Sequence, residues 1–359
     1  MDTGEADFVI SPDGDDRNEG SPAKPFATLE RARQAVRQRL AGDESADVVV
    51  RLRGGRYMLD ETFVRGPEDA PRAGWVTYAA WPGEMPILSG GHEVTEWTRL
   101  DEAPAELPSE AEGNVWVADV PVGSRFHALC DGDGLLTRAH SERMMTDDRE
   151  VDDPIRELCY RPGDVADWPD LAEAELFITP QHAWVVNYLR FAEVDARTRT
   201  ARTTLPATYK LVTPPGNRDV ELFYRIENRL AYLDGPGQWV LDSSKGKLYL
   251  WPRGDQPKGI IVPHLKELVR IEGDFEQANW ARHIRLDGLT FSHCERMVWD
   301  EDRPSLQHDW EFEDTPNALV RLRGAEHVEI RNCVFAESGS GGLRLDLHAV
   351  DNTAAYNEF

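Results

Sequence analysis

Three segments near the C-terminal end carry one pattern: HIRLDGLTF (283–291), HVEIRNCVF (327–335) and DNTAAYNEF (351–359). When they are superimposed, Phe291, Phe335 and Phe359 coincide, at separations of 44 and then 24 residues. A coil of a parallel β-helix takes roughly 20–30 residues, within the period range of solenoid repeats. The sequence therefore predicts a stack of coils, the first of which carries an extra loop near residues 295–316.

Other positions of the three segments agree as well. The further coinciding sets are Leu286, Ile330 and Ala354, and Leu289, Cys333 and Asn357. Equivalent side chains in stacked strands lie about 4.8 Å apart, so we expect one inner column for each set. Asn357 suits such a column because a buried Asn in a turn can bond to the same turn of the neighbouring coil. Leucine-rich repeats would need a tighter leucine spacing than this chain has.

The N-terminal part of the sequence predicts a helix followed by short strands. Residues 28–40 are expected to be helical, with Thr28 as N-cap and one apolar stripe along the helix. That stripe must cover something, and the open end of a strand stack is the natural candidate. The expected strands are Val48–Leu52, Tyr57–Leu59, Thr62–Val64, Trp75–Ala79 and Pro86–Leu88. On their own, strands this short with frequent turns suit a sandwich, a barrel or a solenoid.

The sequence pattern changes between residues 92 and 265, where the segments between turns are longer and rich in Trp and Tyr. We interpret this region as an antiparallel β-sandwich-like domain inserted between coils. The sequence thus predicts an all-β chain in three parts: residues 1–91 with the capping helix and first coils, 92–265 with the insertion, and 266–359 with continuing coils. By the alignment of the repeats Phe359 falls in mid-coil, so we expect coils beyond it.

Composition excludes several partners. Lys plus Arg number 40 against 65 Asp plus Glu, a net charge of −25. So acidic a surface repels phosphate backbones and anionic lipid, which argues against nucleic acid and membrane as partners. No basic region followed by an apolar stretch opens the chain, so no signal peptide is predicted.

The cysteines and acidic loops predict no cofactor. The four cysteines form no metal-ligand cluster, and we expect reduced, mostly buried thiols, although a Cys130–Cys159 bridge stays open. Acidic loops could attract Ca²⁺, yet no ligand spacing predicts a site. Nucleotide-binding, GxSxG and HExxH motifs are absent from the sequence.

Several blocks resemble a known family. SPDGDDRNEGSPAKPFATLERARQAVR resembles the opening segment of many right-handed parallel β-helix proteins. GGRYMLDETF, WVTYAAWPGEMPILSGG, YRIENRLAYLDGPGQWVLDSSKGKLYLWP and HIRLDGLTF resemble carbohydrate-active proteins of the glycoside hydrolase family 141 type. The resemblance covers nearly the whole chain.

The resemblance implies a right-handed parallel β-helix of the pectin lyase-like fold, interrupted by a β-sandwich, and an extracellular or periplasmic location. It also implies activity on fucosyl or xylan-type linkages of a polysaccharide or oligosaccharide. The catalytic acids of such proteins lie on later coils, so no full catalytic set carries over to this sequence.

The best local constellation is GLRLDLHAVDN (342–352). Side chains alternate along a strand, so Arg344, Asp346 and His348 should share the outer face while the intervening leucines point inward. Asp346 and His348 are the candidate catalytic pair, as carboxylate and as donor or proton carrier, and Arg344 is a candidate for binding substrate. An ordinary solvated face with a weak surface ion pair is the alternative.

A second candidate is the loop that follows HIRLDGLTFSHCE. Long loops between coils commonly build the rims of grooves, and Trp faces stack on sugar rings. Its candidate substrate-binding residues are Trp299, Asp300, Asp302, His308 and Trp310. His293 is expected to be a structural turn residue.

Three functions remain open from the sequence. The leading hypothesis is a glycoside hydrolase on plant- or algal-type polysaccharide. A polysaccharide lyase is the second, although six Lys and a charge of −25 argue against a polyanionic substrate unless arginines cluster locally. The third is a non-catalytic carbohydrate-binding or surface β-helix protein.

Overall fold

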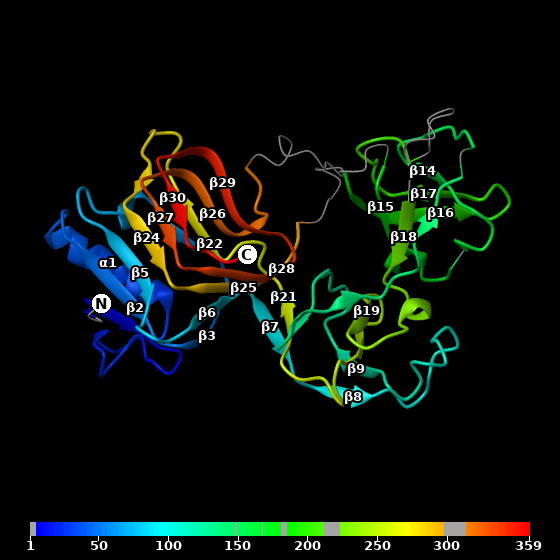
Figure 1. Ribbon diagram of the computed structural model, residues 1–359, viewed down its shortest axis with the longest axis horizontal. Coiled ribbons are helices and arrows are strands. Elements are labelled where there is room, and N and C mark those ends of the chain that lie inside the picture. The colour runs from blue at the N-terminus through cyan, green and yellow to red at the C-terminus, as the bar shows by residue number, and fades with distance from the viewer. Residues whose placement is uncertain (1–4, 148, 167, 181–184, 212–222, 298–313) are drawn as a thin grey trace.

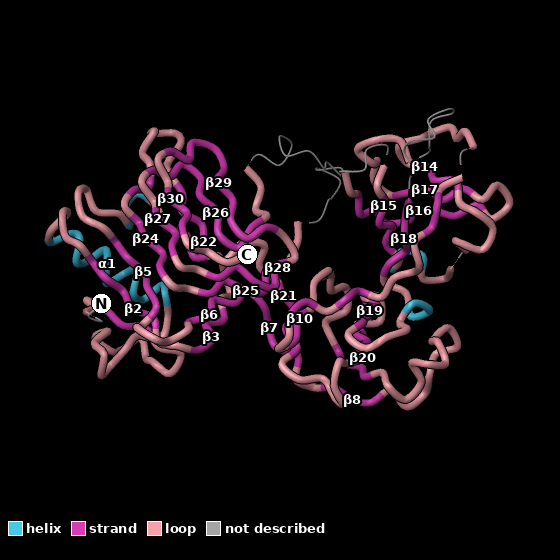
Figure 2. Tube along the Cα trace, in the orientation of Figure 1, coloured by secondary structure: helices cyan, strands magenta, loops and turns pink. Residues whose placement is uncertain are grey.

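The computed structural model describes residues 5–147, 149–166, 168–180, 185–211, 223–297 and 314–359. These residues are mostly β-strand, with one α-helix, α1 (Leu29–Gly42), and the short 3₁₀ helices η1 (Pro67–Asp69), η2 (Leu171–Glu173) and η3 (Leu230–Tyr232). Figure 1 shows parallel strands stacked on one side of the molecule, and Figure 2 shows the strand-rich lobes on the other. The all-β prediction is confirmed at this level.

Three sheets of parallel strands make up the stack. The first contains β1 (Phe8–Ile10), β2 (Val48–Leu52), β5 (Val76–Ala80), β24 (Ile284–Asp287), β27 (Glu329–Arg331) and β30 (Thr353–Ala355). The second contains β3 (Gly55–Met58), β6 (Pro86–Ser89), β25 (Thr290–Cys294) and β28 (Val334–Ser338). The third contains β4 (Phe63–Arg65), β22 (Val269–Glu272), β26 (Ala318–Glu326) and β29 (Gly341–Val350), with β23 (Ala281–Arg282) also on β26. Along the chain the strands visit the first, second and third sheets in a recurring order.

The predicted columns are present. Phe291 stacks on Phe335 with ring centroids 5.3 Å apart, and Phe335 stacks on Phe359 at 4.8 Å. Parallel pairing places Leu286 beside Ile330 and Ile330 beside Ala354. In the third set, the Asn357 side chain accepts a bond from the Cys333 amide at 2.9 Å and donates to the Ile330 carbonyl at 3.0 Å. Like side chains therefore lie over one another, as the repeat predicts.

The helix lies where the apolar stripe predicts. The Thr28 side chain accepts a hydrogen bond from the Arg31 amide, which confirms it as N-cap. The stripe residues are all buried: Leu29, Ala32, Val36 and Leu40. They share one core with the inward side chains of the parallel sheets, so α1 covers the end of the stack next to β1 and β2.

Residues 91–263 run between β6 of the second sheet and β22 of the third. Their strands form three further sheets, mainly antiparallel. One contains β11 (Gly134–Leu135), β10 (Cys130–Asp131), β21 (Ile260–Pro263) and β7 (Gly91–Val94). Another contains β12 (Thr137–Arg138), β19 (Gln238–Asp242), β20 (Lys247–Trp251), β9 (Trp116–Asp119) and β8 (Trp97–Arg99). The last contains β13 (Met144–Met145), β18 (Phe223–Glu227), β15 (Glu175–Ile178), β16 (Asn187–Asp195), β17 (Thr200–Thr203) and β14 (Glu157–Cys159).

The chain leaves and re-enters the parallel stack through a tight crossing at Gly90. Its carbonyl accepts bonds from the amides of His264 and Leu265 at 2.8 and 3.1 Å. A Cβ on Gly90 would lie 2.4 Å from the Leu268 side chain, so only glycine lets the outgoing and returning strands approach this closely.

All four cysteines are free and buried, which agrees with the expected reduced thiols. No helix among the described residues is long and apolar enough to span a membrane.

The phenylalanine column gives a test of the stacked register. Phe291 is fully buried, whereas Phe359 at the end of the same column is 73% exposed. We expect Phe291→Ala to lower the free energy of unfolding by about 3–5 kcal/mol, because it leaves a cavity between neighbouring coils. Phe359→Ala should cost less than about 1 kcal/mol. Equal losses for the two variants in urea denaturation would contradict the column.

Candidate arginine–carboxylate site

The outer face of the third sheet carries an ordered array of charges. Register pairs Arg270 with Arg321 and Arg321 with Arg344, so three arginines form one outward column. Two residues along each strand, a second column holds Glu272, Arg323 and Asp346. The intervening residues, such as Ile271 and Leu322, point into the core. Alternation along each strand thus separates an apolar inner face from a charged outer face.

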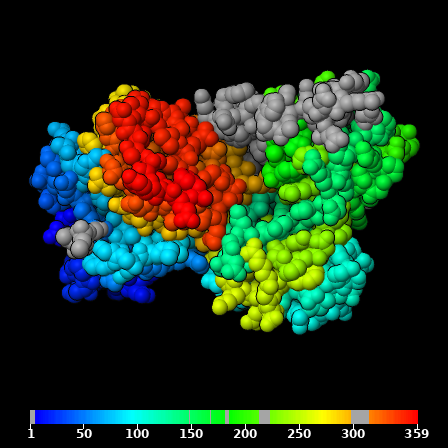
Figure 3. Space-filling model, in the orientation of Figure 1, coloured from blue at the N-terminus to red at the C-terminus, as the bar shows by residue number. Residues whose placement is uncertain are grey.

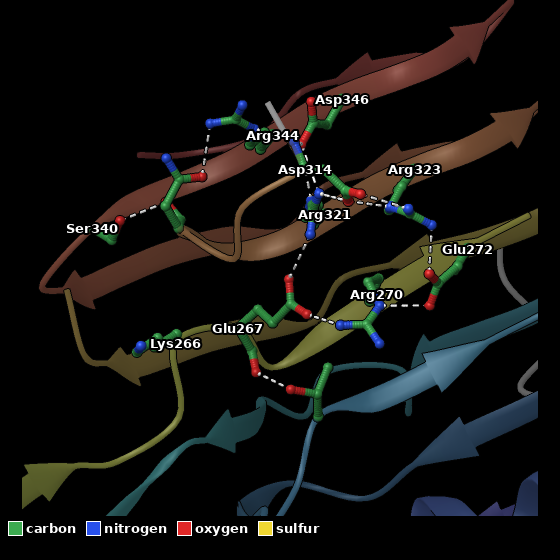
Figure 4. Close-up of polar contacts among 12 residues, drawn as sticks. Lys266, Glu267, Arg270, Glu272, Asp314, Arg321, Arg323, Ser340, Arg344 and Asp346 are labelled. Atoms are coloured by element: carbon green, nitrogen blue, oxygen red, sulfur yellow. Dashed lines mark hydrogen bonds and ion pairs between the residues drawn. The ribbon is translucent and has the colours of Figure 1, made fainter. Parts of the chain in front are cut away.

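Six of these and neighbouring side chains close a ring of alternating charge, the arginine–carboxylate ring (Figure 4). In order, its members are Glu267, Arg270, Glu272, Arg323, Asp314 and Arg321. Arg270 lies 2.8 Å and Arg323 lies 2.7 Å from Glu272. Asp314 lies 2.8 Å from Arg321, and the ring closes where Arg321 lies 3.9 Å from Glu267. Each carboxylate is shared by two guanidinium groups.

Asp346 and Arg344 extend this ring. Asp346 lies 2.7 Å from Arg321 and 3.1 Å from Arg344, and it accepts a bond from the backbone amide of Asp314 at 3.1 Å. It is only 6% exposed, and Arg321 is 2% exposed. The sequence-predicted contact between Arg344 and Asp346 is therefore present, but it is part of a mostly buried network rather than a solvated surface pair.

His348 lies apart from this network. Leu347 and His348 have φ of 36° and 27°, and the pairing of β29 with β26 shifts register there. This bulge breaks the expected alternation. His348 instead lies 2.8 Å from Glu326 and stacks on Trp280 with ring centroids 3.9 Å apart. The expectation that His348 shares the immediate surroundings of Asp346 is corrected on this point, because the bulge re-aims its side chain.

The remaining candidates fall outside the described residues. These are Trp299, Asp300, Asp302, His308 and Trp310, whose proposed binding role stays a prediction. His293 is buried, with Ser89 at 2.8 Å and Glu337 at 2.6 Å from its two ring nitrogens, which suits the structural role expected for it.

Sequence reasoning missed most of the ring. Arg270, Arg321 and Arg323 lie in VRIE (269–272) and ALVRLR (318–323), both of which alternate apolar and charged residues as GLRLD (342–346) does. Superimposing these three segments, as was done for the phenylalanine repeats, would have aligned the arginine column. Asp314 gave no such signal, because it lies outside any strand.

A second charged cluster joins the parallel sheets to the antiparallel ones. Glu175 on β15 lies 2.6 Å from Arg296, which follows β25, and also contacts Arg138 on β12. His127 lies between Glu175 and Glu295, at 3.8 and 3.5 Å. Burial alone would raise the pKa of Glu175, but the charges of Arg296 and Arg138 lower it to about 2. Burial and the charge of Arg296 lower the pKa of His127.

In the described part of the chain, no group of three or more His, Cys, Asp or Glu side chains is arranged to hold a metal ion.

Comparison with known proteins supports the fold. No family model and no curated protein matches the sequence. Over 94% of its length the chain is similar to a solved structure titled "Glycoside hydrolase", with 24% identity and a TM-score of 0.74, and it spans 63% of that structure's chain. This likeness shows a shared fold. A complex of XylC with xylose (13% identity, 91% of this chain and 41% of that one, TM-score 0.32) superimposes too poorly to carry an argument.

The ring predicts a stability cost for losing Asp346. Asp346→Asn removes a counter-charge from buried Arg321, and we expect a loss of about 1–3 kcal/mol in the free energy of unfolding, measured by urea denaturation. Glu44→Gln is the matched control, because the Arg72–Glu44 pair is exposed (81% and 59%) and should contribute about 0–1 kcal/mol. A loss for Asp346→Asn no larger than the control's would contradict the buried network.

The joining cluster predicts acid sensitivity. The pKa of Glu175 lies below its ordinary 4.5, so its stabilisation is present above that pH and is lost as the pH falls toward 2. The pKa of His127 lies below 6.5, so acid also favours the unfolded state, where this imidazole takes up a proton first. We expect Tm to fall as the pH drops from about 6.5 to 3, and less steeply between 6.5 and 4.5 in His127→Gln. Parallel Tm profiles for the two proteins would contradict this account.

Proposed function

We propose that the chain is carbohydrate-active and works as a glycoside hydrolase on plant- or algal-type polysaccharide, with fucosyl or xylan-type linkages as the first substrates to try. The observation that carries the proposal is the likeness in fold to a structure titled "Glycoside hydrolase" over 94% of this chain. The family 141 resemblance of the sequence blocks supports the same activity. Because the chain spans 63% of that structure, the activity of the whole protein is part of the proposal.

The proposal includes the architecture. The three parallel sheets are the faces of a right-handed parallel β-helix, of which residues 1–91 and 266–359 form the coils and residues 92–265 an inserted domain. Two observations support this: the recurring order of the sheets along the chain, and the stacked phenylalanine column. Among the residues that the structure describes, the buried core cluster of the parallel sheets contains none between Leu88 and Leu268, although the partly buried Leu265 packs against it.

Substrate is placed along the outer face of the third sheet. Stacked strands about 4.8 Å apart present side chains at regular intervals, which suits a polymer of repeating sugar units. The less buried members of the ring offer donors and acceptors that sugar hydroxyls can bond: Arg270, Glu272, Arg323 and Asp314. Asp346 and Arg344 belong to this surface, while the bulge gives His348 a separate place beside Trp280. Trp299, Asp300, Asp302, His308 and Trp310 are proposed to complete the binding surface.

The charges of the ring weigh against a uronate lyase. Such an enzyme needs cations free to neutralise a substrate carboxylate, but the three ring arginines are matched by three carboxylates, and Arg344 by Asp346. Because the arginines and carboxylates are already paired with one another, the second candidate function is carbohydrate binding without catalysis. With its Oδ2 already in contact with Arg321, Arg344 and the Asp314 amide, Asp346 is better placed to hold neighbouring groups than to transfer a proton.

Incubation with xylan, a fucosylated polysaccharide and a polyuronate separates the candidates. We expect new reducing ends from a neutral polymer, without the ultraviolet absorbance of unsaturated products. Absorbance from the polyuronate would identify a lyase, and retention in affinity electrophoresis without turnover would identify a binding protein. If none of the three polysaccharides is turned over and none is bound, the proposal is overturned.

Asp346→Ala tests the site. We expect turnover or polysaccharide binding to fall at least about tenfold, corresponding to about 1.4 kcal/mol. The control is Ile330→Val, a buried core change that costs about 0.5–1.5 kcal/mol of stability without touching this face. If both variants retain the wild-type rate and affinity, Asp346 is not part of the site.

A further inference from the structure

The two longest excursions from the parallel sheets leave from one corner of the stack. Residues 91–263 depart after β6, and the segment that begins at Glu295 departs after β25, the strand paired with β6 in the next coil. The Glu295 amide donates to the Leu265 carbonyl at 2.7 Å, next to the Gly90 crossing. The following coil has only a short turn here, between β28 and β29. This corner therefore brings together chain segments that are far apart in sequence.

A cavity of about 550 Å³ lies at this corner, and we call it the corner cavity. Its walls come from β7, β21, the segment from Asp119 to His127, and Lys266, Glu295 and Arg296. The volume falls within the roughly 300–1,000 Å³ of small-molecule sites. Apolar side chains such as Val94, Val120 and Val262 line part of it.

Glu295 is the fixed polar group of the corner cavity. It is 6% exposed, and its carboxylate accepts bonds from the backbone amides of His127 at 2.8 Å, Arg296 at 2.7 Å and Ala128 at 3.4 Å. A carboxylate can accept about four bonds, of which the amides take three, and the His127 ring nitrogen Nδ1 lies 3.5 Å from the same group. A ligand hydroxyl would take the fourth position in place of this longer imidazole contact. Because main-chain donors from two segments hold it, its position is set before a ligand arrives.

A pair of stacked histidines forms another part of the wall. His92 on β7 and His264 after β21 are parallel, with ring centroids 4.1 Å apart and an interplanar angle of 5°. Burial and the neighbouring His92 lower the pKa of His264. A flat ring pair beside fixed polar groups is the combination that binds the apolar face of a sugar together with its hydroxyls.

The charges of the cavity select against an anionic ligand. Arg125, Lys266 and Arg296 face four carboxylates, those of Glu93, Glu96, Asp119 and Glu295. Arg296 is also bonded to Glu175, outside the cavity. No surplus of positive charge is left to neutralise a uronate or a phosphate.

We propose that the corner cavity is a subsite for one or two neutral sugar units of the polysaccharide that runs along the arginine–carboxylate ring. The inference rests on the proposed function and names the substrate class at one end of that site. Lys266 lines the cavity and Glu267 belongs to the ring, so two consecutive residues just before β22 join the cavity to the ring (Figure 4). Glu295 accepts from a sugar hydroxyl, Lys266 donates to another, and the histidine pair carries the ring.

Calorimetric titration with xylobiose, xylohexaose and a neutral fucosylated disaccharide tests the subsite. We expect a neutral disaccharide to bind the wild-type chain, and His264→Ala and Lys266→Ala each to raise its Kd about tenfold. Arg323→Gln is the matched control on the ring, outside the cavity, and it should weaken xylohexaose while leaving the disaccharide Kd unchanged. Melting curves establish that each variant is folded, and His264 and Lys266 are both at the surface of the cavity rather than in a core.

Several outcomes would overturn the subsite. Unchanged disaccharide affinity in both cavity variants would do so, as would tighter binding of a diuronate than of a neutral disaccharide. Polysaccharide turnover without disaccharide binding would overturn the subsite alone and leave the proposed function standing. Absence of turnover together with absence of all binding would overturn both.

Discussion

The parallel register of the stacked strands is the constraint on which the other features depend. It places Phe291 over Phe335 inside the stack and, by the same pairing, Arg321 over Arg270 outside it. Because side chains alternate along a strand, a shift by one residue would turn the arginine column into the core and the apolar column to solvent. The free energy that holds the register therefore comes largely from apolar burial, and the charged outer face is positioned by it.

Like charges in adjacent parallel strands repel one another, and the arginine–carboxylate ring compensates for this repulsion. A column of arginines in parallel strands places cations within reach of one another, and this would be unfavourable without counter-charges. Glu267 and Asp314 lie outside the aligned columns, just before β22 and before β26, and they insert negative charge between the arginines. The segment that precedes β26 is thus tied to the sheet face by Asp314, which contacts Arg321, Arg323 and the Asp346 carboxylate.

Much of the fold was predictable because its signals are local or periodic. The Thr28 cap, the buried stripe of α1 and the phenylalanine column follow from capping chemistry and from repeats. The contacts of Asp346 could not be predicted in this way, since its bond from the Asp314 amide joins segments that share no sequence pattern. The bulge at Leu347–His348 could not be predicted either. A glycine would have indicated positive φ in the sequence, but a Leu and a His with positive φ give no such signal.

The corner cavity follows from where the chain can leave the stack of parallel strands. Every excursion interrupts one sheet-to-sheet turn, and two excursions from neighbouring coils at one turn leave their stems side by side. The stems need polar partners for their main chains, and Glu295 supplies a carboxylate to the amide of His127, which precedes β10, and to the amide of Arg296 at its own strand end. The Gly90 crossing keeps the outgoing and returning strands close, so the antiparallel sheets begin beside the parallel ones. A concave space with apolar and charged walls, next to the charged sheet face, is thus a consequence of the topology.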